Sequence, residues 1–347
     1  MTILTAPRNS VLDRAALRER IAAMPRIRLA SLPTPLEQCP RLTKVLGGPE
    51  IFVKRDDLTG LAFGGNKTRQ LEFLFAEILK EKPDAVIAGA YTQSNWCRQI
   101  TAAAAKLGIK AHLVLIHGIK GPVPQGNSLL DRLMGAEVKV VKLDDMHDLQ
   151  PLLEAEAEML RAAGRKPYVI QPFAMATMSA SALGYVNAVA ELDEQLQVLG
   201  ARADHIYLAG ANITPAGLLL GLKALGRPTR LTSICPIRWA DDRAADIANA
   251  AAERLGLAVS VDPREVIVDE GYIGERYGLV TRAGRVALRL VAETEGVILD
   301  PVYSSKAMSG LIDHIRKGRI GKGETAVFIH TGGNPAVFAY AEELIGE

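Results

Sequence analysis

The sequence predicts an α/β fold in which helices cover both faces of a mostly parallel sheet. Two observations predict it. Seven short apolar runs have the length of strands that are buried on both faces, and the stretches between them carry apolar residues at helical spacing. The runs are residues 85–88, 111–116, 138–141, 168–170, 205–209, 231–235 and 326–329. Expected helices include residues 71–80, 178–199 and 282–295, and the middle part of residues 1–26.

The composition is that of an ordinary soluble enzyme. The 347 residues include 41 Lys and Arg against 39 Asp and Glu, a formal net charge of +2, and no basic stripe interleaved with aromatic residues. A nucleic-acid partner is therefore not expected. No apolar run reaches the roughly 20 residues of a membrane span, and the N-terminus lacks a signal-peptide layout, so no membrane partner is expected. Three widely spaced cysteines and six histidines without ligand spacing predict a reducing cytoplasm and no metal site.

Residues 54–69 contain the most informative lysine of the chain. They read Lys-Arg-Asp-Asp-Leu-Thr-Gly-Leu-Ala-Phe-Gly-Gly-Asn-Lys-Thr-Arg. The charged residues 54–57 are expected to form internal ion pairs that hold this loop, and the glycines deliver Lys67 into the first turn of a helix. The positive end of the helix dipole and burial both lower a lysine pKa, which favours a neutral, nucleophilic amine. Lys67 is thus a candidate for a Schiff base, and the alternative is a solvated or salt-bridged lysine.

Residues 89–98 form a second candidate site. They read Gly-Ala-Tyr-Thr-Gln-Ser-Asn-Trp-Cys-Arg, follow the expected strand 85–88 and precede an alanine-rich helix that ends near Lys106. A strand-to-helix loop at the carboxyl end of a sheet is where open α/β folds bind ligands. Ser94 and Asn95 could equally serve as N-caps of the helix.

Several spaced motifs occur together in the chain. They are Gly-Gly-Asn-Lys-Thr-Arg at 64–69, Gln-Ser-Asn at 93–95, Tyr-Gly-Leu at 277–279, Asp-Pro-Val-Tyr at 300–303, Lys-Ala-Met at 306–308 and His-Thr-Gly-Gly-Asn-Pro at 330–335. In this order they resemble the D-cysteine desulfhydrase and 1-aminocyclopropane-1-carboxylate deaminase family, from about Leu32 to the C-terminus. These are pyridoxal-phosphate enzymes of the tryptophan-synthase-β fold type. The resemblance implies that Lys67 forms the Schiff base with the cofactor.

The resemblance also implies an architecture. It corresponds to fold type II of pyridoxal-phosphate enzymes, with two doubly covered, mostly parallel sheets. A small domain of residues 70–179 is inserted in a large cofactor-binding domain of residues 1–69 and 180–347, and the active site lies in the cleft between them. A homodimer is expected.

A third segment, residues 208–217, is implied to hold the phosphate. It reads Leu-Ala-Gly-Ala-Asn-Ile-Thr-Pro-Ala-Gly, follows an apolar run and opens a helix. Its backbone N–H groups and the Thr214 hydroxyl would meet the anion, and the loop itself is Gly210, Ala211, Asn212 and Ile213. Relatives have a loop richer in glycine, serine and threonine. Because isoleucine tolerates positive φ poorly, either Ile213 has a permissive angle or the grip on phosphate differs.

The remaining cofactor contacts follow from the resemblance. Asn66 is expected beside the cofactor, and Asn95 is expected to donate to the 3'-oxygen. The ring nitrogen is expected to meet a hydroxyl, Ser304, where the cyclopropane deaminases carry glutamate, with Thr331 as a second candidate. A hydroxyl leaves the ring nitrogen neutral, which favours β-elimination over opening of a cyclopropane.

Proton transfer and substrate binding involve the other family positions. Ser94, Tyr277 and Tyr303 are the expected catalytic hydroxyls beside Lys67, which is the expected base for the α-proton. Gln93, Ser94 and Asn95 are expected to bind the substrate, and Trp96 stands where desulfhydrases commonly have histidine. Trp96 either faces the substrate or turns away to pack between helices.

The expected reaction is therefore β-elimination from a small amino acid. The leading prediction is a D-cysteine desulfhydrase that yields pyruvate, hydrogen sulfide and ammonia. The alternatives are an L-cysteate sulfo-lyase or another lyase of β-substituted amino acids, with the cyclopropane deaminase less favoured because of Ser304. From a different class, the chain could bind pyridoxal phosphate with little turnover.

Overall fold

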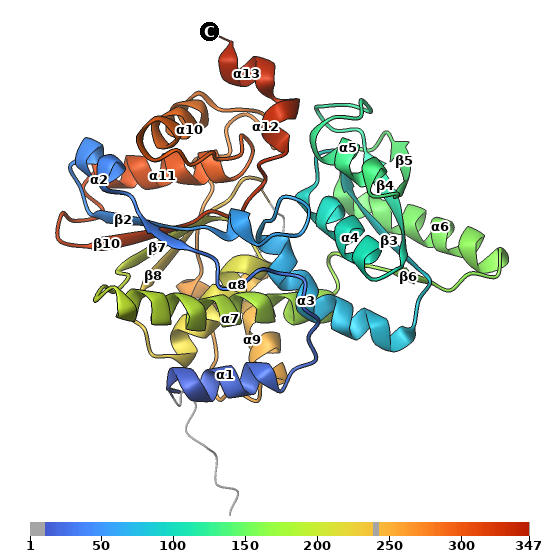
Figure 1. Cartoon of the computed structure of the whole chain (residues 1–347), viewed down its shortest axis with the longest axis horizontal. Helices are drawn as coiled ribbons and strands as arrows, with labels where there is room; N and C mark the ends of the chain where they lie inside the picture. The colour runs from blue at the N-terminus through green and yellow to red at the C-terminus, as the bar shows by residue number, and fades with distance from the viewer. Residues whose placement is uncertain (1–10, 239–242, 347) are drawn as a thin grey trace, which may run out of the picture.

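Two β-sheets lie side by side in the computed structural model, which describes residues 11–238 and 243–346 (Figure 1). The larger sheet has the strand order β1-β2-β10-β7-β8-β9, and the smaller has the order β5-β4-β3-β6. Every neighbouring pair is parallel except β1 and β2. The α/β class and the two mostly parallel sheets are thereby confirmed.

All seven strands predicted from apolar runs are present. They are β3 (Ala85–Tyr91), β4 (Lys110–Ile116), β5 (Glu137–Val141), β6 (Pro167–Val169), β7 (His205–Ala209), β8 (Arg230–Ile234) and β10 (Thr325–Ile329). Three strands were not predicted: β1 (Leu36–Gln38), β2 (Glu50–Lys54) and β9 (Ile267–Asp269). Each offers at most three consecutive apolar residues beside charged or polar ones, too short a run to indicate a strand.

Burial on both faces was a wrong expectation for two of these strands. No residue of β5 or β6 is fully buried, whereas β7 is buried along its whole length. Both are edge strands of the small sheet, so each has only one strand neighbour. Apolar runs therefore located these strands correctly but overstated how deeply they lie.

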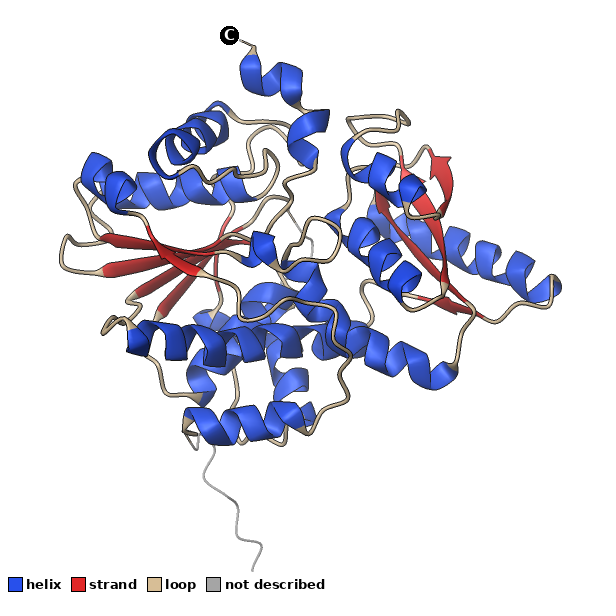
Figure 2. Cartoon of the chain, in the orientation of Figure 1, coloured by secondary structure: helices blue, strands red, loops and turns tan. Residues whose placement is uncertain are grey.

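Helices cover both sheets on both faces (Figure 2). Those of the described residues are α1 (Arg14–Ala22), α2 (Pro40–Leu46), α3 (Asn66–Ile78), α4 (Asn95–Lys106), α5 (Gly126–Leu133), α6 (Gln150–Ala162), α7 (Met175–Val198), α8 (Ile213–Ala224), α9 (Ala244–Arg254), α10 (Arg282–Glu295), α11 (Ser304–Arg316), α12 (Ala336–Ala339) and α13 (Ala341–Ile345). The expected helices are confirmed, although α3 begins five residues earlier, at Asn66. None of the described helices is long and apolar enough to cross a membrane.

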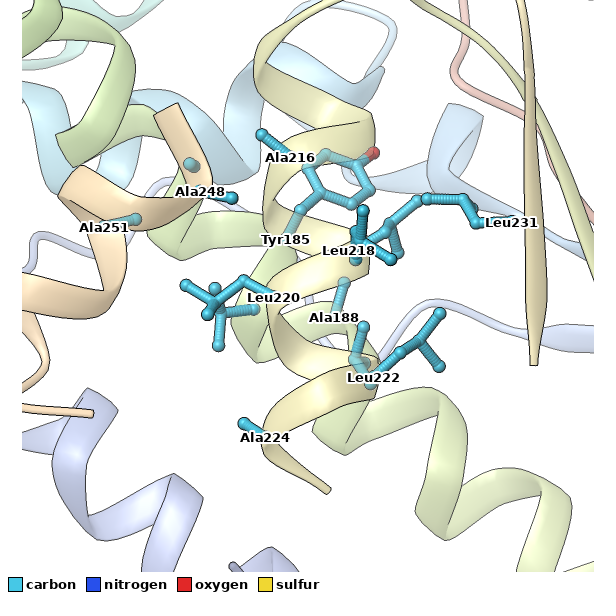
Figure 3. Close-up of a cluster of buried hydrophobic side chains, with 14 of the residues drawn as sticks. Tyr185, Ala188, Ala216, Leu218, Leu220, Leu222, Ala224, Leu231, Ala248 and Ala251 are labelled. Carbon is cyan, nitrogen blue, oxygen red and sulfur yellow. The ribbon is translucent and has the colours of Figure 1, made fainter. Parts of the chain in front are cut away.

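The large sheet separates two apolar cores by the alternation of its side chains. On β7, Ile206 and Leu208 pack with α1, α7, α8 and α9, and Tyr207 and Ala209 pack on the opposite face with α10 and α11. Figure 3 shows part of the first core, where side chains of α7, α8 and α9 meet. Successive residues of a strand point to opposite faces, so a strand buried on both sides reads as a continuous apolar run.

The small sheet is covered by α3 and α4 on one face and by α6 on the other. Its strands come from residues 85–169, and those of the large sheet come from residues before and after this stretch. The predicted domain boundaries, at 69/70 and 179/180, fall inside α3 and α7. Since these two helices pack against each other, the large and small units are joined through helices.

Candidate active site

A cavity of about 210 Å³ lies where the carboxyl ends of β3, β7 and β8 meet the starts of α3, α4 and α8. Its wall contains most of the predicted site residues: Asn66, Lys67, Ser94, Asn95, Trp96, Gly210, Ala211, Asn212, Ile213, Thr214, Tyr277, Tyr303 and Thr331. Residues far apart in the sequence are thus brought to one place, at the sheet edge where α/β folds bind ligands.

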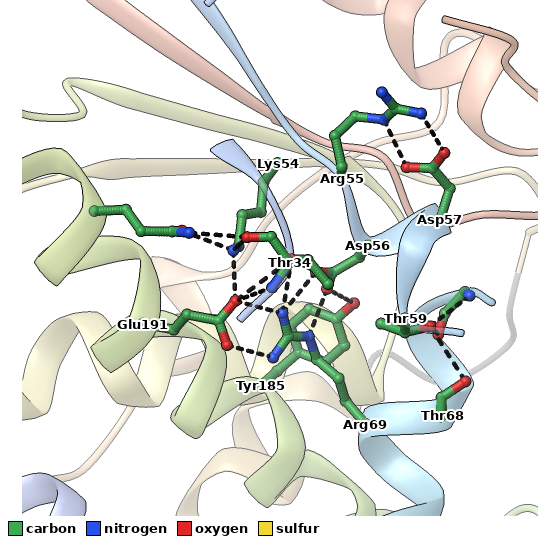
Figure 4. A network of polar contacts seen from close by, with 12 residues as sticks. Thr34, Lys54, Arg55, Asp56, Asp57, Thr59, Thr68, Arg69, Tyr185 and Glu191 are labelled. Atoms are coloured by element: carbon green, nitrogen blue, oxygen red, sulfur yellow. Dashed lines mark hydrogen bonds and ion pairs between the residues drawn. The ribbon is translucent and has the colours of Figure 1, made fainter. Parts of the chain in front are cut away.

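A buried ionic network holds the helix that carries Lys67 (Figure 4). Arg69 is fully buried, donates to both carboxylate oxygens of Asp56 at 2.8 and 2.9 Å, and also donates to Glu191 at 2.8 Å. Glu191 accepts in turn from Lys54 at 2.5 Å, and the Tyr185 hydroxyl donates to Asp56 at 2.7 Å. Burial opposes the charge of Asp56, but the neighbouring Arg69 holds its pKa below the usual value. The predicted internal ion pairs are present, and they fix the first turn of α3.

The loop before Lys67 has an unusual backbone. Ala62, Phe63, Gly64 and Gly65 all have positive φ, at 45°, 67°, 65° and 123°. The φ of Gly65 strongly favours glycine, and a Cβ there would also lie 2.6 Å from the Gln99 amide nitrogen. The chain therefore approaches α4 closely just before it enters α3.

The Lys67 amine has the environment of a nucleophile. Burial lowers its pKa from 10.5 to about 8. It forms no ion pair within the described part of the chain, and its Nζ lies 5.9 Å from the centre of the Trp96 ring. A buried amine without a carboxylate partner is easily deprotonated, as covalent attachment to a carbonyl compound requires.

The start of α8 forms a cradle for an anion. The backbone N–H groups of residues 211–214 make no hydrogen bond with any described residue, and the buried Asn212 side-chain oxygen is likewise unpartnered. The Thr214 hydroxyl accepts from Asn66 at 3.1 Å and from Gln70 at 3.0 Å, so its own proton is available to a ligand. Neither Asn212 nor Ile213 has positive φ, which answers the question raised by the isoleucine. Free N–H groups at the start of a twelve-residue helix suit a phosphate.

The start of α4 combines capping with exposure to the cavity. Ser94 is the N-cap and accepts from the Cys97 N–H at 3.1 Å, so its hydroxyl proton remains available to the cavity. The side-chain oxygen of Asn95 accepts from Asn127 at 2.9 Å, which leaves the Asn95 amide N–H₂ as a donor. Ser94 can therefore cap the helix and contact a ligand in the cavity at the same time.

Two predicted residues do not reach the cavity wall. The Gln93 side chain donates to the Gln125 carbonyl at 2.9 Å and accepts from the Asn127 N–H at 3.0 Å, so it ties the start of α5 to its own loop. Ser304 is fully buried at the start of α11, where its hydroxyl donates to Asp300 at 2.6 Å. As a correction to the expectation, the hydroxyl candidate on the wall is Thr331, and Ser304 is occupied elsewhere.

Tyr277 and Tyr303 face one another across the cavity wall. Their hydroxyl groups hydrogen-bond to each other, and their ring centres lie 5.9 Å apart. Burial raises the pKa of both tyrosines, so both keep their protons at neutral pH. Trp96 also lines the cavity, and it packs at the same time against the apolar cluster formed by α3, α4 and the small sheet.

Other wall residues were not singled out individually from the sequence. Tyr91 ends β3 with its ring centre 5.1 Å from that of Tyr277, and Met146, Phe173 and Ile237 supply an apolar side. Single apolar residues in loops are ordinary, so only the folded chain reveals that they share one cavity. Tyr91, Tyr277 and Tyr303 also line a neighbouring cavity of about 540 Å³.

A lysine of lowered pKa and a helix start with unbonded N–H groups face one cavity, a combination that suits the class of enzymes that hold pyridoxal phosphate covalently. The chain belongs to the family described as pyridoxal-phosphate dependent enzyme, which it matches over residues 27–332. The expected cofactor is thereby confirmed, and the unbonded N–H groups of the cradle fit its phosphate.

Individual relatives within this family are similar to the chain over nearly its whole length. The chain is 38% identical to a D-cysteine desulfhydrase of Klebsiella pneumoniae, over 94% of this chain and 99% of that protein. It is also 38% identical to a 1-aminocyclopropane-1-carboxylate deaminase of Burkholderia vietnamiensis, over 92% of this chain and 97% of that one. A crystal structure of an ACC deaminase homologue superposes with a TM-score of 0.85, at 37% identity, covering 98% and 99% of the two chains. The resemblance stated from the motifs is confirmed.

Proposed function

We propose that the chain is a lyase that eliminates a β leaving group from a small amino acid, with D-cysteine as the leading substrate. The products would be pyruvate, hydrogen sulfide and ammonia. Relatives with the name D-cysteine desulfhydrase, similar over nearly their whole length, support this choice. When bound, pyridoxal phosphate withdraws electrons from the carbons of the amino acid.

One observation carries the choice of elimination over ring opening. Among the described residues that line the Lys67 cavity there is no carboxylate, and Thr331 offers a neutral hydroxyl. A neutral partner does not keep a ring nitrogen protonated, so the site supports less carbanion character. A thiolate leaves readily and needs less of that support than a cyclopropane carbon does, which favours a β-elimination.

The side chains take distinct parts in this proposal. Ser94 and the N–H groups at the start of α4 bind the substrate carboxylate, and Asn95 donates to the cofactor oxygen. Lys67 moves the α-proton, because its amine has a lowered pKa, faces the cavity and carries no ion pair within the described chain. Tyr277 and Tyr303, protonated and joined by a hydrogen bond, hold a proton for the leaving group.

An L-cysteate sulfo-lyase is the second candidate, and one observation favours it. The neighbouring cavity that shares Tyr277 and Tyr303 is also lined by Lys142 and Arg276, by Lys120, which pairs with Glu343, and by one carboxylate, Asp144. A sulfonate leaving group carries a negative charge that these cations attract. The remaining candidate functions, in decreasing order of preference, are lyases of other β-substituted amino acids, the cyclopropane deaminase, and a pyridoxal-phosphate binding protein with little turnover.

A substrate screen on the cofactor-loaded protein separates these functions. Pyruvate, sulfide and sulfite are measured with D-cysteine, L-cysteine, L-cysteate, D-serine and β-chloroalanine. Sulfide and pyruvate from D-cysteine, at the highest kcat/KM of the set, are the expected result. Sulfite from L-cysteate as the faster reaction would replace the leading candidate, and bound cofactor without any product would favour the binding protein.

We propose further that the chain is a cytoplasmic homodimer. Large apolar side chains are exposed on two helices that contact each other, with Phe338 of α12 78% exposed and Leu133 of α5 72% exposed. A partner copy would remove these side chains from water. Cys39 and Cys97 are buried and free, which suits a reducing compartment. Light scattering should give twice the mass of the chain, and a monomeric mass at micromolar concentration would reject the dimer.

A further inference from the structure

Arg98 of α4 is a buried charge that the proposed chemistry does not use. Its side chain is fully buried, and no carboxylate of the described residues lies within 4.0 Å of its guanidinium. Burial lowers its pKa from 12.5 to about 10. A buried charge without an ion pair is costly, so its hydrogen bonds must supply the compensation.

These hydrogen bonds go to the loop that delivers Lys67. One terminal nitrogen of Arg98 donates to the Ala62 carbonyl, and the other donates to the Gly64 carbonyl at 3.0 Å. Ala62 and Gly64 both have positive φ and stand three to five residues before Lys67. An arginine on the small unit therefore holds the strained segment from which α3 starts.

The third donor of the guanidinium leads to the substrate loop. The Arg98 Nε donates to the side-chain oxygen of Asn127 at 2.7 Å, and Asn127 is fully buried. The Asn127 amide nitrogen then donates to the Asn95 side chain at 2.9 Å and to the Gln93 carbonyl at 2.8 Å. Two side chains thus connect residues 62–64 with residues 93–95, and a terminal nitrogen of Arg98 also reaches the Asn95 side-chain oxygen directly, at 3.5 Å.

We propose that Arg98 is a positioning residue, which aligns the Lys67 amine with the substrate-binding loop through these two sets of hydrogen bonds. Through Asn127 it also sets which end of the Asn95 amide is free to donate. This inference rests on Lys67 as the attachment point of the cofactor, within the proposed function. The planar fork of arginine reaches two carbonyl groups and a side chain together, which the point charge of lysine does not reproduce.

The experiment compares Arg98→Met and Arg98→Lys with the control Arg289→Met, which also loses a hydrogen bond from arginine to a backbone carbonyl, that of Leu344. The first measurement is hydrogen exchange of cofactor-free protein at the Gly64 and Gly65 amides. In the folded chain these amides donate to Gly60 and Asp56, at 2.9 and 3.1 Å. Faster exchange at these two amides is expected in Arg98→Met, with smaller acceleration in Arg98→Lys and none in the control.

The second measurement is the dissociation constant of pyridoxal phosphate, followed by the visible absorption of the lysine-bound form. Arg98→Met should weaken binding by about tenfold or more, as expected for losing hydrogen bonds to a charged group, and should lower kcat more than it raises KM. Unchanged exchange together with unchanged cofactor binding would overturn the proposal. A uniform rise in exchange over the whole chain would also overturn it, since that indicates a merely structural role.

A variant of Asn127, the residue that links Arg98 to Asn95, provides a second test in case Arg98→Met does not fold. Asn127→Leu leaves Arg98 and its two carbonyl bonds in place but removes the 2.9 Å hydrogen bond to Asn95, so that only the longer contact from Arg98 to the Asn95 oxygen, at 3.5 Å, remains. It should raise KM for the substrate with little change in hydrogen exchange at Gly64 and Gly65. An unchanged KM would reject the connection from Arg98 through Asn127 to Asn95. If the wild type binds the cofactor at Lys67 but turns over no amino acid, the proposed function fails. The cofactor-binding and hydrogen-exchange measurements would still test the positioning role of Arg98.

Discussion

Two helix starts face the same cavity and are built in different ways. The start of α8, after β7, offers backbone N–H groups that are unbonded within the described chain, and no charged side chain. The start of α4, after β3, is capped by Ser94 and pinned by Asn127 through Asn95. One site is made mainly of backbone, and the other is made of interlocked side chains.

This difference indicates how each site tolerates sequence change. A backbone cradle binds phosphate through N–H groups that every residue except proline supplies, so Asn212 and Ile213 can replace the usual small residues. The α4 loop depends on the identity of each side chain, because each amide group has an assigned partner. Substitutions should therefore have larger effects on the α4 and tyrosine side than on the α8 side.

Removal of a tyrosine hydroxyl is expected to have the largest effect of these tests. Tyr303→Phe breaks the hydrogen bond to Tyr277 and should lower kcat by roughly 10²-fold, the scale of one acid–base group. Ile213→Ser in the cradle should change kcat less than about threefold, because it leaves the N–H groups in place. Steady-state kinetics on the best substrate measures both, and equal losses in the two variants would remove the contrast between the sites.

Covalent attachment of the cofactor should depend on pH through Lys67. The neutral amine attacks, and burial lowers the Lys67 pKa to about 8, so the amine is protonated below that pH and neutral above it. The attachment rate of cofactor-free protein should fall about tenfold per pH unit below pH 8 and level off above it. Stopped-flow absorption follows this rate. A rate still rising steeply at pH 10 would show an ordinary lysine pKa.

Two matched hydroxyl deletions test whether Thr331, and not Ser304, contacts the ring nitrogen of the cofactor. Thr331→Val removes the hydroxyl on the cavity wall and should lower kcat/KM by about tenfold. Ser304→Ala removes the hydrogen bond to Asp300 and should cost about 1 kcal/mol of unfolding free energy while kcat/KM stays near the wild-type value. Urea unfolding and kinetics on both variants decide the matter, and the reverse pattern would return the role to Ser304.

The smallest effect concerns specificity. Trp96→His shortens a side chain that lines the cavity and replaces an indole by an imidazole. The ratio of kcat/KM between D-cysteine and L-cysteate should change by several-fold, on the scale of about 1 kcal/mol for a pocket contact. The screen described above measures this ratio. Identical ratios in wild type and variant would show that the indole does not contact the substrate.

Much of the site could be predicted because its motifs are local. Lys67, Ser94 and Thr214 each stand at the first turn of a helix that follows a recognisable loop, and the structure brings all three to one cavity. Ser304 does not line the cavity, which could not be foreseen because the sequence does not tell which way the first turn of α11 directs its side chains. There the hydroxyl turns to Asp300, four residues before it.

Long-range pairing was beyond prediction for a different reason. Arg98 lies in a helix whose sequence gives no sign of its partners, and its two carbonyl acceptors belong to a loop more than thirty residues away. Backbone carbonyls exist at every position, so no residue type indicates which of them will be bound. The short strands β1 and β9 were missed similarly, because three residues show no periodicity.

The most direct test asks which lysine carries the cofactor. Two lysines, the partly buried Lys67 and the buried Lys306, have a pKa lowered to about 8, and the Lys306 amine donates to the Ile273 carbonyl at 2.7 Å. Borohydride reduction of the loaded enzyme, digestion and mass spectrometry locate the attached group. We predict that the label appears on the peptide containing Lys67 alone. Label on Lys306, or on neither peptide despite yellow protein, would contradict the account.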